Sequence, residues 1–154
     1  QKPAVKSNVN ELVLGSKEVR FQNELKEAQQ YVKTAPFVSL SWISLGKANQ
    51  NLKKYYDAIS AYNQAIKIEP GNVQAHEGVA ESKKDMGDTV NAIFEYEKLV
   101  ASKPDSIDYS YNLATLYLKL NNKTEASRTL NNLLKNNDKA SDNSDVKSIY
   151  KQLN

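Results

Sequence analysis

Three acidic residues recur at a spacing of four: Glu77, Glu81 and Asp85. On a helix this spacing places the three carboxylates on one face, where they can attract a cation or a basic side chain of a partner. Two carboxylates one turn apart make only a weak cation site. The spacing therefore favours binding of a basic partner over binding of a metal ion. The alternative is that these carboxylates are simply exposed to solvent on a helix face.

Catalytic chemistry has few residues available. The chain has no Cys and a single His, His76, and no Gly-rich phosphate loop is present. Ser and Asp are frequent, but one His gives no indication of a Ser-His-Asp arrangement. The sequence predicts that the protein is not an enzyme and that it has no catalytic residue, no cofactor and no metal site.

Composition and charge limit the classes of partner that the chain is expected to bind. The net charge is +3 over 154 residues, and basic and acidic residues are interspersed, which argues against nucleic-acid binding. No run of 18 apolar residues occurs, so no transmembrane segment is expected. The chain begins with Gln1 rather than Met, and the cytoplasm and a periplasmic or secreted location receive equal weight.

An internal repeat dominates the sequence. Pro36, Pro70 and Pro104 are each separated by 34 residues. The same interval relates residues of matching size and polarity, which are Leu45, Val79 and Leu113; Gly46, Ala80 and Ala114; Ala58, Ala92 and Ala126; and Tyr62, Tyr96 and Leu130. Independent positions that agree at one period indicate a stack of similar units.

Each unit is predicted to hold two helices. Trp42, Leu45 and Leu52 follow the spacing of one helical face, and Ala58, Tyr62 and Ala65 follow that of a second. The turn at Lys53 and Lys54 corresponds to Gly87 and Asp88, where Gly is expected just past a helix end. Small residues such as Gly46 and Ala58 are expected to face each other across the hairpin and let the backbones approach. Trp42, Tyr62, Tyr96 and Tyr117 are assigned to the core, whereas Tyr111 is expected to be exposed. His76 shares the large-residue position of Trp42 and is interpreted as structural.

This pattern resembles the tetratricopeptide repeat (TPR) family. Its Trp–Leu–Gly–Tyr–Ala–Phe–Ala–Pro signature is matched by Trp42, Leu45, Gly46, Ala58, Tyr62, Ala65 and Pro70, with Asn49 in place of the first Tyr. The second unit keeps Val79, Ala80, Ala92, Tyr96, Leu99 and Pro104, and the third keeps Leu113, Ala114, Tyr117 and Ala126. The resemblance implies an all-α fold, a right-handed α-solenoid of antiparallel helix pairs with a C-terminal capping helix.

The expected organisation extends from this register. Ser16 is a plausible N-cap, so a helix or degenerate repeat is expected over residues 16–36, preceded by a mobile or loosely packed segment, 1–15. Three repeats follow at 39–72, 73–106 and 107–140. Val146, Ile149, Tyr150 and Leu153 give residues 141–154 one apolar face, as expected of a capping helix.

The resemblance also implies where a partner would bind, because the first helices of such repeats line a concave groove. The groove positions are Leu40, Ile43, Lys47, Gln50, Gln74, Glu77, Glu81, Asp85, Asp108, Tyr111, Thr115 and Leu118. The clamp for acidic chaperone tails is not matched, since only Lys47 is basic and Asp108 would repel a carboxylate.

The leading hypothesis is therefore a protein–protein interaction module, an adaptor that binds a peptide carrying basic and apolar residues. A dissociation constant of roughly 1–100 μM would be typical of such a contact. The alternative is a scaffold whose repeats mediate homo-oligomerisation, with the helix at residues 16–34 docked on a neighbouring copy.

Overall fold

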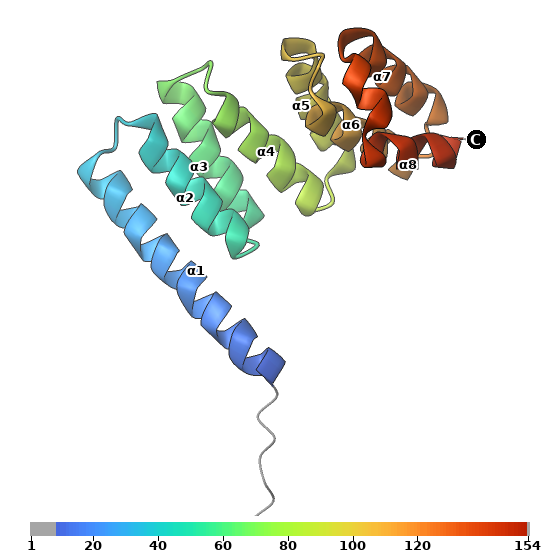
Figure 1. Ribbon diagram of the computed structural model, residues 1–154. Helices are drawn as coiled ribbons and strands as arrows, with labels where there is room; N and C mark the ends of the chain where they lie inside the picture. Colours follow the sequence, from blue (N-terminus) through green and yellow to red (C-terminus); the bar gives the residue numbers. More distant parts are fainter. Residues whose placement is uncertain (1–8, 154) are drawn as a thin grey trace, which may run out of the picture. The chain divides into compact units, whose positions relative to one another are not determined.

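The computed structural model describes residues 9–153, and every regular element among them is helical (Figure 1). The α-helices are α1 (Val9–Thr34), α2 (Ser39–Asn51), α3 (Tyr55–Ile68), α4 (Val73–Asp85), α5 (Thr89–Ser102), α6 (Ile107–Lys119), α7 (Lys123–Asn136) and α8 (Ser144–Leu153), with a 3-10 helix, η1 (Asp138–Asp142), before the last. The expected all-α class of paired helices is confirmed. The chain divides into unit 1, residues 1–75, and unit 2, residues 76–154.

The turn that ends the first helix of each pair has the same geometry in all three pairs. Lys53, Gly87 and Asn121, spaced by 34 residues, have positive φ angles of 58°, 87° and 56°. The residue after each returns its N–H to the carbonyl five residues earlier at 2.9 Å, as in Asp88 to Lys83. This Schellman-type ending closes the helix and reverses the chain. Gly87 was expected here, whereas Lys53 and Asn121 adopt the conformation despite the cost to a residue with a Cβ.

The first helix begins earlier than expected. Ser16 was predicted to be an N-cap, but its hydroxyl donates to the carbonyl of Val13 at 2.8 Å, a bond made inside a helix. Helix α1 starts at Val9 and runs 26 residues, twice the 13 of α2. Of the predicted N-terminal segment, residues 9–15 are therefore helical, and residues 1–8 lie outside the described part of the chain.

In unit 1 the close approach of α2 and α3 depends on Gly46. A Cβ on Gly46 would lie 2.6 Å from Cε1 of Tyr62, and its three nearest atoms all belong to that ring. The side chain that limits the space at Gly46 is therefore that of Tyr62. The Tyr62 side chain is 1% exposed, and its hydroxyl donates to Oε1 of Gln50 at 2.9 Å. Trp42 is only half-buried, and its indole N–H donates to the carbonyl of Pro36.

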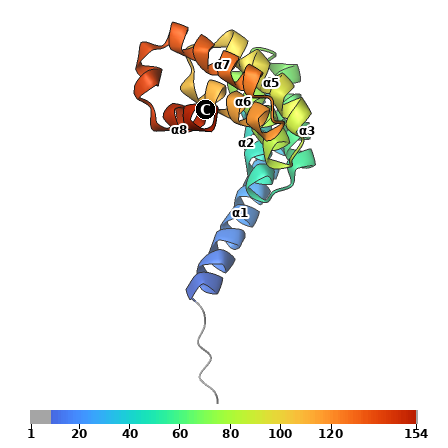
Figure 2. The same cartoon turned by 90° about the vertical axis from the view of Figure 1, so that its right-hand side faces the viewer.

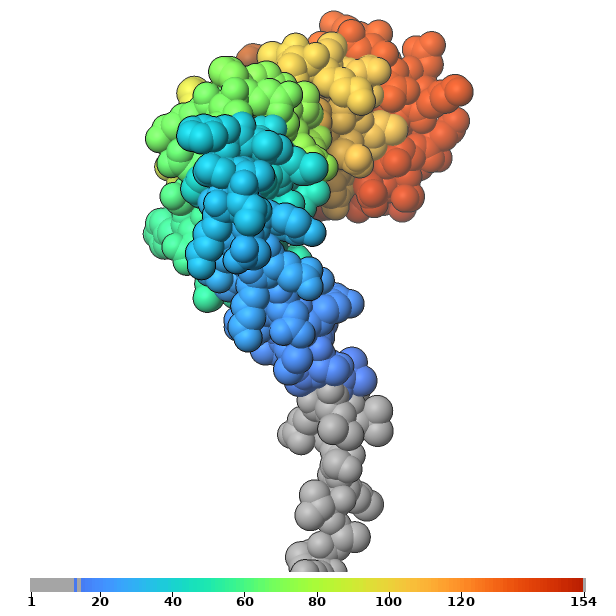
Figure 3. Space-filling view, turned by 90° about the vertical axis from the view of Figure 1, so that its left-hand side faces the viewer, coloured from blue at the N-terminus to red at the C-terminus, as the bar shows by residue number. Residues whose placement is uncertain are grey.

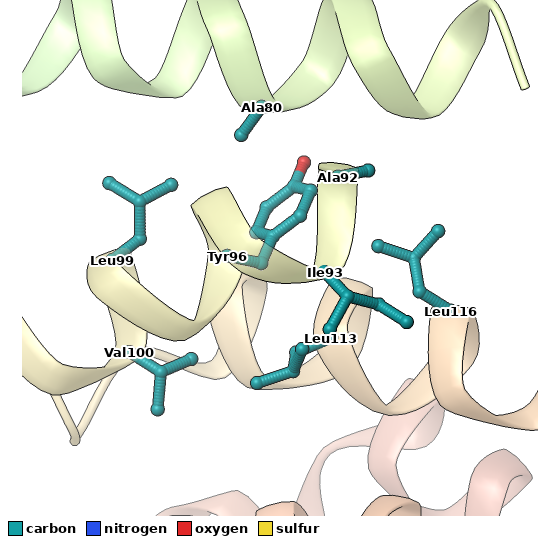
Figure 4. Packing of buried hydrophobic residues seen from close by; sticks show 8 residues of the cluster. All are labelled: Ala80, Ala92, Ile93, Tyr96, Leu99, Val100, Leu113 and Leu116. Carbon is teal, nitrogen blue, oxygen red and sulfur yellow. The ribbon is translucent and has the colours of Figure 1, made fainter. Parts of the chain in front are cut away.

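In unit 2 two apolar clusters hold α4 to α8 together. The first joins Ala80 of α4 to residues of α5 and α6, and Figure 4 shows the ring of Tyr96 pointing toward Ala80. The second joins α6 and α7 to the chain end, where Ala140 of η1 and Val146 and Ile149 of α8 are all buried. Helix α8 thus lies against α6 and α7 (Figure 2).

A larger side chain at Ala92 should disturb the first of these clusters. Ala92 is fully buried beside Ala80 and Tyr96. Ala92→Leu adds three heavy atoms to a closed space, so the free energy of unfolding should fall by roughly 1–3 kcal/mol. Urea denaturation of both chains measures this difference. Val90→Leu, at a position of α5 that is 66% exposed, is the control and should leave stability nearly unchanged.

Candidate functional site

The three acidic residues predicted to form one stripe do lie on one helix, α4, and we call Glu77, Glu81 and Asp85 the acidic row. Glu81 and Asp85 are exposed, while Glu77 is half-buried. The helix starts at a side-chain cap, because Oδ1 of Asn72 accepts from the N–H of Ala75 at 3.1 Å. The row is thereby fixed on a helix whose two ends are both closed by local hydrogen bonds.

Helix α6 is tied to α4 next to the acidic row. The hydroxyl of Tyr109 donates to a carboxylate oxygen of Glu77, and Nζ of Lys84 donates to Oδ1 of Asn112 at 2.9 Å. Lys84 also lies 5.9 Å from the ring centre of Tyr96. Glu77 is thus partly committed to a structural contact and is half-buried, whereas the side chains of Glu81 and Asp85 are exposed.

The acidic row produces a negative field that reaches the protein interior. Burial raises the pKa of the Tyr96 hydroxyl, and the charges of Glu81, Asp85 and Glu77 raise it further. The pKa of Tyr109 rises to about 12, first through burial and then through its hydrogen bond to Glu77. Since each carboxylate disfavours a second negative charge nearby, the surface around the row should attract cations.

The remaining predicted residues of unit 2 lie on α6. Asp108 and Thr115 are exposed, and the Thr115 hydroxyl donates to the carbonyl of Tyr111 at 2.8 Å. Tyr111 was expected to be exposed, but it is half-buried and packs with Leu118 against the cluster that contains Ile149 of α8. Their apolar area is therefore shared between the core and the surface. We call the acidic row and these four α6 residues together the α4–α6 surface.

The predicted residues of unit 1 do not form one set. Ile43 is 2% exposed and cannot contact a partner, which corrects its assignment to a groove. Leu40 is 61% exposed, and Lys47 and Gln74 are exposed as well. Gln50 is half-buried and accepts the hydrogen bond from Tyr62.

Hollows in the described part of the chain are lined mostly by residues that were not predicted to bind a partner. One, of about 900 Å³ in unit 2, lies over α5, α6 and α7 and is lined by residues that include Val100, Pro104, Leu113, Tyr117, Arg128 and Lys135. The Tyr117 hydroxyl there donates to Glu97. Second helices supply most of this lining, and the groove expectation considered only first helices. No sequence motif marks it.

The second hollow lies between α1 and α2 in unit 1. Its volume is about 320 Å³, and its walls are Glu24, Glu27, Ala28 and Tyr31 of α1 and Ser44, Lys47, Ala48 and Asn51 of α2. Nδ2 of Asn51 donates to Oε2 of Glu24 at 3.2 Å across it. Of the residues predicted to line the groove, only Lys47 lines this hollow, so Lys47 lies beside α1.

Across residues 9–153 there is no cluster of three or more His, Asp or Glu side chains able to hold a metal ion. His76 is half-buried on α4. None of the helices described combines the length and apolarity needed to cross a bilayer.

Comparison with known proteins relates the chain to repeat proteins. A family model described as a tetratricopeptide repeat matches residues 39–72, and another of the same description matches residues 84–153. Superkiller protein 3 of Schizosaccharomyces pombe is 25% identical over 100 residues, which are 65% of this chain and 7% of that protein. The chain thus corresponds to a small part of that relative.

Solved structures share the fold. A MamA crystal structure has a TM-score of 0.71 and 21% identity, covering 80% of this chain and 68% of that one. A tetratricopeptide repeat protein from Parabacteroides merdae has the same score and identity, covering 94% and 55%. YrrB, described as a TPR protein with an unusual peptide-binding site, has a TM-score of 0.71 at 12% identity, covering 88% and 68%.

Proposed function

The chain belongs to the tetratricopeptide repeat family, and from that premise we propose that the α4–α6 surface binds a peptide segment of a partner protein. Proteins of this fold are protein–protein interaction modules. The observation that carries the proposal is the acidic row on α4, in which Glu81 and Asp85 are exposed one turn apart. The unusual peptide-binding site of YrrB, a protein of the same fold, is consistent with this function.

The proposed peptide has a stated chemistry. A Lys or Arg side chain would lie against Glu81 and Asp85, which are exposed and one turn apart. Apolar residues on the same peptide would contact the accessible parts of Tyr111 and Leu118. The charges steer and orient the peptide, while the apolar contacts supply most of the binding free energy.

Reversing two charges of the row should weaken this binding. In Glu81→Lys/Asp85→Lys, two attractive contacts become repulsive, so the dissociation constant for a partner should rise about tenfold or more, which corresponds to about 1.4 kcal/mol. Affinity capture from cell lysate, followed by titration of the retained protein, measures the change. Glu77 stays natural because its bond to Tyr109 is structural.

The matched control is Asp105→Lys/Asp138→Lys, which makes the same change of charge at two positions outside α4. A partner lost from the row variant but kept by the control supports the proposed surface. Equal retention by all three chains means that the acidic row is merely solvated and that the site lies elsewhere.

Self-assembly is a second candidate function, favoured by the uncovered face of α1. Every described residue from Gly15 to Arg20 is exposed, and the buried residues of this helix, Leu25 and Ala28, lie in its second half. A homo-oligomer formed through α1 should show a mass that rises with concentration in sedimentation experiments. The two functions are compatible, because the α4–α6 surface does not include α1.

A further inference from the structure

Helix α1 occupies the position of a second helix, and among the described residues 9–153 no preceding helix packs on it. By the 34-residue register, Glu24, Ala28 and Tyr31 of α1 correspond to Ala58, Tyr62 and Ala65 of α3. The three α3 residues are at most 1% exposed. Tyr31, in contrast, is 58% exposed, and Glu24 is half-buried. Ala28, between them, is 3% exposed because it packs with Leu25 on Ala48 of α2. The face that is fully covered in α3 is therefore only partly covered in α1, at Ala28.

The residues that would have formed that covering helix instead prolong α1. At 1.5 Å per residue, 26 residues of α1 extend about 39 Å, whereas the 13 residues of α2 extend about 20 Å. Figure 1 shows α1 projecting beyond the α2–α3 pair, and Figure 3 shows its blue N-terminal half uncovered on that face. The hollow between α1 and α2 lies beside the other half, and it is bounded by Glu24, Glu27, Ala28 and Tyr31.

One stripe along α1 joins the projecting half to the hollow. Successive members lie close together on one face of the helix, most of them three or four residues apart; they are Val13, Ser16, Lys17, Arg20, Glu24, Glu27, Ala28 and Tyr31. The first half of this stripe carries two cations, Lys17 and Arg20, and the second half carries two carboxylates, Glu24 and Glu27. A stripe with opposite charges in its two halves is complementary to its own reversed copy.

We propose that the occupant of the α1–α2 hollow is the projecting half of α1 from a second copy of this chain, in an antiparallel, isologous pair. Centred on residue 22, this pairing places Lys17 opposite Glu27 of the second copy and Arg20 opposite its Glu24. Ser16 then lies opposite Ala28, where two small side chains permit close approach, and Val13 lies opposite Tyr31. Two-fold symmetry repeats each contact, so the pair contains each ion pair twice.

The charges present in the single chain support this occupant. Arg20 already pairs with Glu24 of its own helix at 3.5 Å, with side chains 63% and 41% exposed, and Glu24 also accepts a hydrogen bond from Nδ2 of Asn51. Such an exposed pair contributes little to the stability of the single chain, so exchanging it costs little. Lys17 and Arg20 lie near the ring of Phe21, at 5.7 and 5.0 Å from its centre. Lys17 and Arg20 thus lie close to each other on the projecting half of α1, where a second copy of the chain can contact both.

The proposal specifies the second candidate function and rests on it, and it is independent of the α4–α6 surface. In Lys17→Glu/Arg20→Glu, positions 17, 20, 24 and 27 of the stripe are all acidic. In Glu24→Lys/Glu27→Lys, the same four positions are all basic. Each variant alone should dimerise at least about tenfold more weakly than the natural chain. An equimolar mixture should form a heterodimer, because all four facing pairs then have opposite charges.

Sedimentation equilibrium on the 154-residue chain, at low salt and again at high salt, measures these affinities, and the heterodimer also shows that both variants are folded. Lys26→Glu/Lys33→Glu is the matched control, since these lysines lie on the opposite face of α1, and it should dimerise normally. The α4 variant Glu81→Lys/Asp85→Lys should do so as well. A natural chain that stays monomeric, with no heterodimer in the mixture, overturns both self-assembly and this pairing. A dimer that ignores the charge reversals overturns the pairing alone.

Discussion

Gly46→Leu should lower the free energy of unfolding of unit 1 by roughly 3 kcal/mol. Even the first added atom, the Cβ, would lie 2.6 Å from the Tyr62 ring, which is 1% exposed and has no room to move outward. The gain in helix propensity on replacing Gly, about 1 kcal/mol or less, offsets only part of this cost. Chemical denaturation followed by circular dichroism measures the change.

The control for this prediction is Gly71→Leu, because a Cβ at Gly71 meets no atom within 4 Å. It should leave stability within about 0.5 kcal/mol of the natural chain. In the background Tyr62→Ala, which removes the ring, Gly46→Leu should no longer be destabilising and should refill part of the vacated space. If Gly46→Leu costs the same in both backgrounds, the ring contact is not the reason for glycine at this position.

Leu130→Ala should lower the free energy of unfolding of unit 2 by about 2–5 kcal/mol. Leu130 is fully buried in the cluster that joins α6 and α7 to η1 and α8, where Leu133 and Ala140 are also 0% exposed. Removing its side chain leaves a cavity that the surrounding helices can close only in part. Urea denaturation measures the loss, and hydrogen exchange should show earlier opening of α8, which is held by this cluster.

A matched truncation at the surface separates burial from residue type. Leu120→Ala removes the same atoms at a position that is 49% exposed, so its effect should be within about 1 kcal/mol. Equal losses from the two substitutions would contradict the assignment of Leu130 to the centre of the cluster. An unchanged exchange rate in α8 would show that the C-terminal helix is held by other contacts.

The periodicity of the sequence accounts for most of the fold. Pro36, Pro70 and Pro104 set the interval, and Gly87 marks a helix end because glycine tolerates the positive φ found there. Lys53 and Asn121 share that conformation, which residue type alone would not predict; only their register with Gly87 indicates it. The buried positions of Tyr62, Tyr96 and Leu130 also follow from the register.

Three predictions about single residues were wrong, because the local sequence pattern did not show the contacts that each side chain makes. Ser16 resembles an N-cap, but an uninterrupted helix from Val9 is compatible with its hydroxyl bonding back to Val13. Tyr111 was assigned to a surface, but α8, the expected capping helix, packs against α6 and covers part of the Tyr111 side chain. Ile43 is 2% exposed, and its position within the repeat unit did not indicate that the side chain would be buried.

The binding residues were less predictable than the fold, because a repeat period reports on packing while a binding surface depends on exposed side chains. The spacing of Glu77, Glu81 and Asp85 predicted one helix face, and they do lie together on α4. It did not show that Glu77 is held by Tyr109 or that Lys84 is held by Asn112. The open stripe on α1 was recognisable only after the length of α1 was known.

The central claim, that the α4–α6 surface selects a peptide with a basic residue between apolar ones, is tested most directly by peptide display. A random library is selected on the natural chain and depleted on Glu81→Lys/Asp85→Lys. We predict enriched peptides in which Lys or Arg has apolar neighbours, bound with dissociation constants of roughly 1–100 μM and more weakly at high salt. Enrichment of acidic peptides, or of peptides that bind the variant equally well, would contradict the claim.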